Sequence, residues 1–406
     1  MAVAELTGVS ARSWRALAAP VRIGILYLLS RLVTTGFFIA AAQLSTPASR
    51  YGAHPGVPAL LMGWDAQWYW FIAVHGYPST LQVDDAGAVV QNQWAFMPVY
   101  PYLARLLGGT GVGWQPAAIC ISLVAGYLAA LVLYALLRPR VGAAVATWAV
   151  LLFASAPLAA IFQIGYAESL FLLWLFLALW AVMRRRYGWL YLLVPLMGFT
   201  RPGVLAFALM LALHGVHRWL IRRREPLPLR QGLHIVALGL WAAVVGLSWP
   251  VIAGAVTGRP DAYLATELSW RAGWGAGAAG GFVPFQAFWQ GAAFWLRTWG
   301  LGEAAGYVVL AVLLALVAAA LLFARRVRRL GVEIRLWSAS YLLYLLAVFF
   351  PQSSLFRLLV PLSPLWGAVV PRSRVWRFVM LAACLAGQWW WIYTMYAVGN
   401  TFWQIP

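Results

Sequence analysis

The chain consists of long apolar runs separated by short turns that carry clusters of arginine. A helix that crosses a bilayer needs about 20 apolar residues, and 64% of the 406 residues are hydrophobic while 10% are charged. Soluble domains have about a quarter of their residues charged. The pattern therefore excludes a soluble globular protein and predicts an all-α, polytopic membrane protein with about eleven spans.

The expected spans follow the apolar runs between the arginine clusters. We place nine of them at 23–44, 116–137, 141–163, 166–183, 232–256, 303–324, 336–350, 355–370 and 375–398. The other two share residues 189–220, which are too few for two full spans and are interrupted by Phe-Thr-Arg-Pro-Gly at 199–203. Because Arg-Pro-Gly cannot continue a helix, and non-helical backbone within a membrane must face a cavity, we expect two half-length helices there.

Alternation of these spans puts every arginine cluster on the same side of the membrane. By the positive-inside rule that side is the cytoplasm. The N-terminal residues 1–22 are then cytoplasmic, and the long segments 45–115 and 257–302 lie outside. We interpret 1–406 as a single multi-pass domain of the cell membrane. The basic residues are all arginine, and we read the net charge of +19 as a compositional bias, not as a nucleic-acid-binding surface.

The segment 63–78, Gly-Trp-Asp-Ala-Gln-Trp-Tyr-Trp-Phe-Ile-Ala-Val-His-Gly-Tyr-Pro, is too polar to span a bilayer and too aromatic for an ordinary loop. Its spacing predicts a helix in the headgroup layer, where Trp and Tyr rings are favoured. Asp65 falls in the first turn, where the helix dipole favours an ionised carboxylate. Such a group at the outer membrane surface can act as a general base. The alternative is a structural acid that pairs with Arg31 or Arg105.

Four other polar residues are candidates for the same outer site. Glu168 lies at the outer mouth of a span, and Arg201 follows the helix break, where its forked donors suit a phosphate. Arg357 lies near the outer end of another span, and His75 closes the aromatic segment. The alternatives are a helix-start carboxylate for Glu168, an arginine that extends to the surface for Arg357, and a structural hydrogen bond for His75.

The sequence gives little indication of a metal site, a nucleotide site or a cofactor site. The histidines lack metal-like spacing with carboxylates, and both cysteines lie within apolar runs. The pair Asp84-Asp85 could hold a divalent cation, but Asp-Asp-Ala-Gly also fits an ordinary turn, which we favour. The sequence contains no P-loop and no glycine-rich dinucleotide motif. We therefore expect no metal and no cofactor.

Several short motifs together resemble the bacterial relatives of the PIG-V-type GPI mannosyltransferases, within the GT-C superfamily of membrane glycosyltransferases. They occur in the expected order and lie at 63–69 (GWDAQWY), 75–78 (HGYP), 95–102 (AFMPVYPY), 166–171 (YAESLF) and 200–203 (TRPG), with Arg357 ahead of the PLSP at 361–364. Two departures bear on the choice of acceptor: Met97 replaces an aromatic residue of the family pattern, and the loop 79–93 is particular to this chain.

The resemblance implies an inverting transfer of a sugar, most simply mannose, from a polyprenyl-phosphate donor to a lipid or glycan acceptor on the extracytoplasmic face. Asp65 would be the catalytic base. The expected phosphate-binding residues are Arg201, Arg357, Arg105 and His75. The expected acceptor or sugar-binding residues are Glu168, Tyr166, Trp64, Gln67, Trp68 and Tyr69. Two alternatives are a transporter or flippase of lipid-linked sugar, with Arg201 at a gate, and a non-catalytic envelope scaffold.

Overall fold

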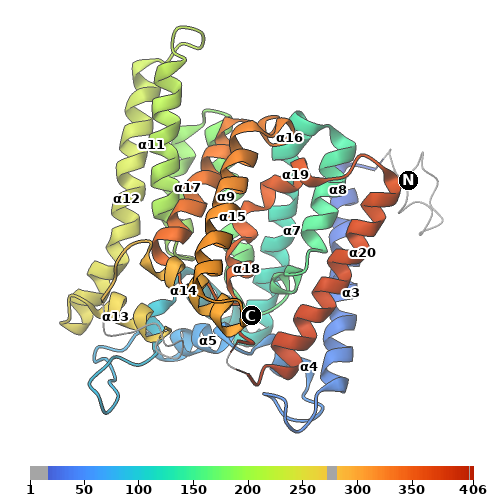
Figure 1. Ribbon diagram of the computed structural model, residues 1–406, viewed down its shortest axis with the longest axis vertical. Coiled ribbons are helices and arrows are strands. Elements are labelled where there is room, and N and C mark those ends of the chain that lie inside the picture. The colour runs from blue at the N-terminus through green and yellow to red at the C-terminus, as the bar shows by residue number, and fades with distance from the viewer. Residues whose placement is uncertain (1–16, 272–280, 402) are drawn as a thin grey trace.

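The computed structural model describes residues 17–271, 281–401 and 403–406 (Figure 1). The described residues form helices and no strand, apart from an isolated bridge between Val83 and Val89. Five helical segments are long and apolar enough to cross a membrane. They are α3 (Ala19–Leu44), α7 (Trp114–Val141), α12 (Leu229–Thr257), α15 (Glu303–Phe323), and α20 (Arg374–Trp391) continued by η8 (Ile392–Val398). The protein is a helical membrane protein, as the apolar runs predict.

Shorter helices complete the bundle, and two of the expected spans are interrupted. The span expected at 141–163 contains α8 (Ala143–Ala154) and η3 (Ala159–Phe162), since Pro157 disfavours helix at the residue before it. The span expected at 355–370 is divided into α18 (Leu355–Leu358), η7 (Val360–Leu365) and α19 (Trp366–Val369). Pro361 and Pro364 lack the amide donors that a continuous α-helix requires.

The break predicted within 189–220 is confirmed. After η4 (Tyr187–Trp189), α10 (Leu190–Gly198) stops and α11 (Val204–Leu220) begins beyond the Arg-Pro-Gly sequence. Gly203 has a φ of +130°, a conformation that side chains rarely adopt. The interruption leaves Arg201 between α10 and α11, with its side chain 14% exposed.

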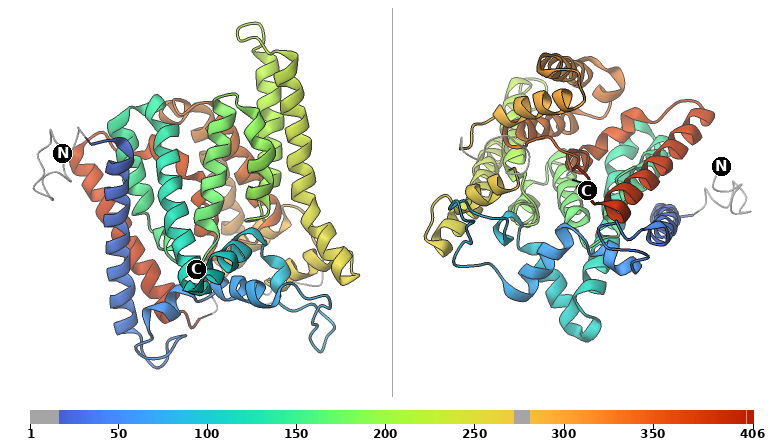
Figure 2. Two further views of the ribbon diagram at one scale, coloured as in Figure 1. Left: turned by 180° about the vertical axis from the view of Figure 1, so that it is seen from behind. Right: turned by 60° about the horizontal axis from the view of Figure 1, so that its bottom comes forward.

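Short helices gather at one end of the bundle, the lower end in Figure 1. They are α4 (Val57–Leu61), α5 (Asp65–His75), α6 (Val99–Leu107), α13 (Ala262–Ser269) and α14 (Gln286–Thr298), with η1 (Gln93–Ala95) and η2 (Gly108–Val112) between them. The opposite end carries α16 (Arg325–Arg328), the beginning of α20 and the α11–α12 turn (Figures 1 and 2). The two ends therefore differ in kind: arginine-rich turns lie at one, and aromatic short helices lie at the other. Between them, α17 (Val332–Val348) runs beside α11.

The central helix of the bundle is α9 (Glu168–Met183), which is buried along nearly its whole length. It packs closely on α7, where small residues such as Ala125 and Ala129 are buried. Because α9 starts at Glu168, the carboxylate of this residue lies in the interior of the bundle.

Arg31 on α3 binds carbonyl groups and not Asp65, its partner in the alternative interpretation of that acid. Its guanidinium donates to the carbonyl of Ala159 at 2.5 Å and to that of Ala154, the last residue of α8. The rings of Tyr27 and Phe162 flank it, at 5.3 and 5.6 Å from the guanidinium carbon. Arg31 thus satisfies carbonyls that the interruption after α8 leaves unpaired.

Candidate functional site

The helix predicted within 63–78 is confirmed as α5, with Asp65 in its first turn. The chain enters it through a tight approach, because a side chain at Gly63 would overlap the hydroxyl of Tyr51. Gly76, with a φ of +74°, ends the helix. These two glycines limit α5 at its two ends. The Asp65 carboxylate, in the first turn, contacts Arg357.

Asp65 is the first member of a chain of four charged groups, which we call the charge cluster. An oxygen of Asp65 lies 2.5 Å from a terminal nitrogen of Arg357, and the same nitrogen lies 3.3 Å from an oxygen of Glu168. Arg201 pairs with that oxygen of Glu168. The four side chains come from α5, α18, α9 and the α10–α11 break, so distant parts of the chain build one electrically balanced site.

Burial decides which member of the charge cluster a ligand can reach. The exposed fractions of the side chains are 5% for Glu168, 9% for Arg357, 14% for Arg201 and 19% for Asp65. Buried charges persist only when they are paired, and a guanidinium keeps its charge under such conditions. Asp65 is the most accessible of the four, as a group that meets a substrate must be.

Several buried polar atoms beside the charge cluster have no hydrogen-bond partner among the described residues. They include the hydroxyl of Ser169 and the Nε of Arg357, whereas the hydroxyls of Tyr166 and Tyr396 face each other. The guanidinium of Arg357 also lies 5.1 Å from the centre of the Tyr166 ring. Because buried polar groups are nearly always hydrogen-bonded, this surplus of donors and acceptors favours a polar ligand or ordered water at the site.

Trp64, Trp68 and Tyr69, at and near the start of α5, all contact other parts of the protein. The indole N–H of Trp64 donates to the carbonyl of Met395 at 3.0 Å, and the guanidinium of Arg50 lies 3.9 Å from its ring centre. Trp68 packs against Phe96 and Trp270 at ring separations of 6.0 and 5.8 Å.

Tyr69 is also largely buried, with 3% exposed, within reach of the charges of the cluster. The structure therefore gives these three aromatic side chains clear packing roles, and it leaves their predicted sugar contacts untested.

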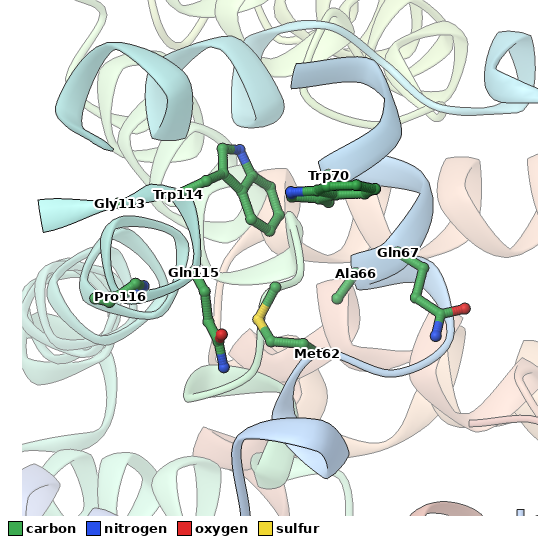
Figure 3. Close-up of a pocket in the computed structure, with 8 residues that line it drawn as sticks. All are labelled: Met62, Ala66, Gln67, Trp70, Gly113, Trp114, Gln115 and Pro116. Carbon is green, nitrogen blue, oxygen red and sulfur yellow. The ribbon is translucent and has the colours of Figure 1, made fainter. Parts of the chain in front are cut away.

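Gln67 does not belong to the charge cluster and lines a separate pocket of about 460 Å³ (Figure 3). Its lining consists of Met62, Ala66, Gln67, Trp70, Gly113, Trp114, Gln115 and Pro116. The indoles of Trp70 and Trp114 lie next to each other in Figure 3, and Gln115 and Gln67 lie on opposite sides of Met62 and Ala66 in this view. The pocket is lined by uncharged groups, so it differs in chemistry from the charge cluster.

The structure does not bring His75 or Arg105 into the charge cluster. His75 is exposed at the end of α5, beside the rings of Trp70 and Phe71. Arg105 is exposed on α6 and has no ion-pair partner within the described part of the chain. Of the four predicted phosphate-binding residues, Arg201 and Arg357 are thus the pair that the fold assembles.

One acid that the sequence analysis did not single out is Glu267 on α13. Burial raises the pKa of its carboxyl to about 7, against the opposing effects of the Tyr263 hydroxyl and the Arg271 guanidinium. Arg271 itself donates to the carbonyl of Val348 at 2.5 Å. The spacing of Glu267 and Arg271, four residues apart in an outer segment, was the available signal.

Metal ligands are not grouped in the described residues: no three His, Cys, Asp or Glu side chains lie together there. The interpretation of Asp84-Asp85 as a turn is confirmed. Asp84 Oδ1 accepts hydrogen bonds from the amides of Ala86 and Ala88 at 3.0 and 2.9 Å. This carboxylate closes a local loop.

Comparison of the sequence with known protein families finds no match, and comparison with curated proteins finds none either.

Proposed function

We propose that the protein is an inverting membrane glycosyltransferase of GT-C type, which moves a sugar, most simply mannose, from a polyprenyl-phosphate donor to a lipid or glycan hydroxyl. The observation that supports this most directly is the contact of Asp65 with Arg357, within a buried cluster that also holds Glu168 and Arg201. A base and two permanent cations side by side are the groups that displacement of a lipid phosphate requires.

In the proposed reaction, Asp65 accepts the proton of the acceptor hydroxyl. The acceptor oxygen then forms a bond to the anomeric carbon from the face opposite the phosphate. The bond between that carbon and the phosphate oxygen breaks, and its electron pair stays on the phosphate. Arg357 and Arg201 stabilise the charge that develops on this leaving group. Inversion at the anomeric carbon follows from the single displacement.

The resting pairing suggests how the donor activates the base. Arg357 binds Asp65 through one terminal nitrogen, while its Nε has no hydrogen-bond partner among the described residues. A donor phosphate that engages Arg357 competes with the carboxylates for the same guanidinium. Its binding would therefore weaken the hold on Asp65 and leave that oxygen available for the acceptor proton.

The proposal includes an orientation. Arginine-rich turns gather at one end of the bundle and the short aromatic helices at the other (Figure 1). With the positive-inside rule, the first end and the N-terminus would be cytoplasmic, and the charge cluster would open to the extracytoplasmic surface. About eleven segments would then enter or cross the bilayer, and of the two expected half-length helices only α10, with 9 residues, is that short, since α11 has 17.

The decisive experiment is Asp65→Asn in purified full-length protein, assayed with polyprenyl-phosphate mannose and a set of lipid acceptors. We expect at least about a hundredfold loss of transfer, the lower range for removal of a general base. The matched control is Asp85→Asn, an exposed acid in the neighbouring loop, which we expect to leave transfer unchanged. Melting temperatures establish that both variants fold.

Two outcomes would reject parts of the proposal. Undiminished transfer by Asp65→Asn would remove Asp65 as the base. Movement of labelled lipid across liposomes without a new glycosidic bond would identify a transporter instead. We expect transfer to continue in EDTA, because arginine can neutralise the leaving phosphate. Loss of transfer in EDTA, restored by magnesium or manganese, would contradict that part.

A further inference from the structure

A second hollow, of about 630 Å³, lies at the arginine-rich end of the bundle, opposite the end that carries α5 (Figure 1). We call it the α20 groove. Its lining consists of Arg326, Val369, Pro371, Arg372, Ser373, Trp376, Val379, Met380 and Ala383. These residues come from α16, from the end of α19, from the link between α19 and α20, and from the first turns of α20. The groove thus combines charged groups at its mouth with an apolar wall along one helix.

The apolar wall is a single stripe of α20. Trp376, Val379, Met380 and Ala383 recur at intervals of three and four residues, the spacing that puts side chains on one helix face. Trp376 is 63% exposed and Val379 is 47% exposed, so no described part of the protein covers the stripe. From Trp376 to Ala383 the helix rises roughly 10 Å. The stripe therefore fits within the hydrocarbon layer of one leaflet, about half of a 30 Å core.

The mouth of the α20 groove carries uncompensated positive charge. Arg326 and Arg372 are exposed, and neither has an ion-pair partner within residues 17–271, 281–401 and 403–406. The described acids at this end are engaged elsewhere: Glu225 pairs with Arg185, and Glu333 lies 3.9 Å from Arg140. The described side chains therefore supply no anion to Arg326 and Arg372.

We propose that the α20 groove binds one anionic phospholipid of the cytoplasmic leaflet. Its phosphate lies between Arg326 and Arg372, the Ser373 hydroxyl donates to a phosphate oxygen, and an acyl chain follows the apolar stripe of α20. Trp376 occupies the boundary between headgroup and hydrocarbon, where indoles are favoured. We favour a phospholipid over a protein segment because its phosphate matches the positive charge at the mouth of the groove and its acyl chain matches the apolar stripe.

The test uses full-length protein and native mass spectrometry with phosphatidylglycerol, phosphatidylcholine and a polyprenyl monophosphate. The variant is Arg326→Gln with Arg372→Gln, and the control is Arg223→Gln with Arg224→Gln in the exposed α11–α12 turn. We expect about 25-fold weaker phosphatidylglycerol binding in the first variant, from a factor of about five for each arginine. We expect little change in phosphatidylcholine binding, and little change in the control.

A second variant tests the apolar half of the same groove. Ala383→Trp fills the stripe without altering charge, and it should also weaken phosphatidylglycerol binding. Equal loss in the Arg223 and Arg224 control, or retained binding in the first variant, would overturn the proposal. Loss confined to the polyprenyl monophosphate would overturn the assignment to phospholipid. The result is independent of the proposed enzyme activity, because Asp65→Asn should bind phosphatidylglycerol normally.

Discussion

Glu168 is the residue on which the charge cluster depends electrostatically. Its side chain is 5% exposed, and one of its oxygens faces both Arg201 and Arg357. Two guanidiniums and two carboxylates cancel, so loss of any one charge leaves a net charge in a buried site. An unpaired buried charge is far less stable than the intact pair.

We therefore expect Glu168→Gln to destabilise the protein by about 3–5 kcal/mol, the cost of breaking a buried ion pair by removing one partner. The measurement is thermal unfolding of purified protein in detergent. Adding Arg201→Gln to Glu168→Gln restores neutrality and should recover part of the loss. In contrast, Glu225→Gln breaks an exposed pair with Arg185 and should cost about 0–1 kcal/mol. Equal effects of Glu168→Gln and Glu225→Gln would show that the charge cluster contributes no special stability.

The sequence predicted the individual residues of the cluster better than their partners. Asp65, Glu168, Arg201 and Arg357 were identifiable because charges are rare and costly in apolar segments. Their pairing was not, since Asp65 and Arg357 are separated by 292 positions. The alternative in which Asp65 pairs with Arg31 does not hold, because Arg31 donates to carbonyls after an interrupted helix and Asp65 pairs with Arg357.

At the scale of the elements, α14 is held against its neighbours by two glycines. A side chain at Gly306 on α15 would overlap the backbone carbonyl of Ala292 on α14, with its carbon 2.7 Å away. Gly291 on α14 packs in the same way against the ring of Pro351. Backbone atoms cannot move aside as side-chain ends can, so these contacts fix the position of the helix.

Gly306→Ala should therefore push α14 away from α15 and lower stability by about 1–3 kcal/mol, the usual cost of overpacking. Gly239→Ala on α12 is the matched control, because no atom lies within 4 Å of the added carbon. That change should be neutral or stabilising by up to about 1 kcal/mol, since alanine is the better helix former. Thermal unfolding of both variants measures the difference. Equal stability of the two variants would contradict the close packing of α14 on α15.

Apolar runs predicted where the helices lie, and proline accompanies the interruptions of the expected spans, although Pro139, Pro195 and Pro250 lie inside helices. The break at 199–203 was predictable because Arg-Pro-Gly is an unmistakable interruption. The interruptions at Pro157, Pro361 and Pro364 fell inside runs whose hydrophobicity suggested complete spans. Hydrophobic length indicates that a segment can be buried in a membrane, whereas helix continuity depends on backbone donors that a hydropathy pattern does not report.

The molecule as a whole has two chemically distinct ends. The turns rich in arginine and the α20 groove lie at one, and α5, α6, α13 and α14 lie at the other (Figures 1 and 2). Membrane insertion responds to such asymmetry, because arginines are retained on the cytoplasmic side. The orientation in the cell is therefore a prediction that concerns the whole chain.

Single cysteines should report this orientation. In a background with Cys120→Ala and Cys384→Ala, Ser79→Cys lies in the exposed loop after α5, and Arg223→Cys lies in the exposed α11–α12 turn. We expect a membrane-impermeant maleimide to label Ser79→Cys in intact cells, and to label Arg223→Cys only after lysis. The reverse pattern would place Asp65 on the cytoplasmic side and would remove the basis for an extracytoplasmic enzyme.

The neutrality of the charge cluster has a consequence for turnover. Under the proposed reaction, a phosphodiester donor enters with one negative charge, whereas the phosphomonoester that remains after cleavage carries nearly two. Asp65 then holds the proton of the acceptor and is neutral, so the cluster carries one net positive charge and binds the spent carrier more tightly than it bound the intact donor. Loss of that proton from Asp65 restores the neutral cluster, so release of the carrier would follow deprotonation of Asp65.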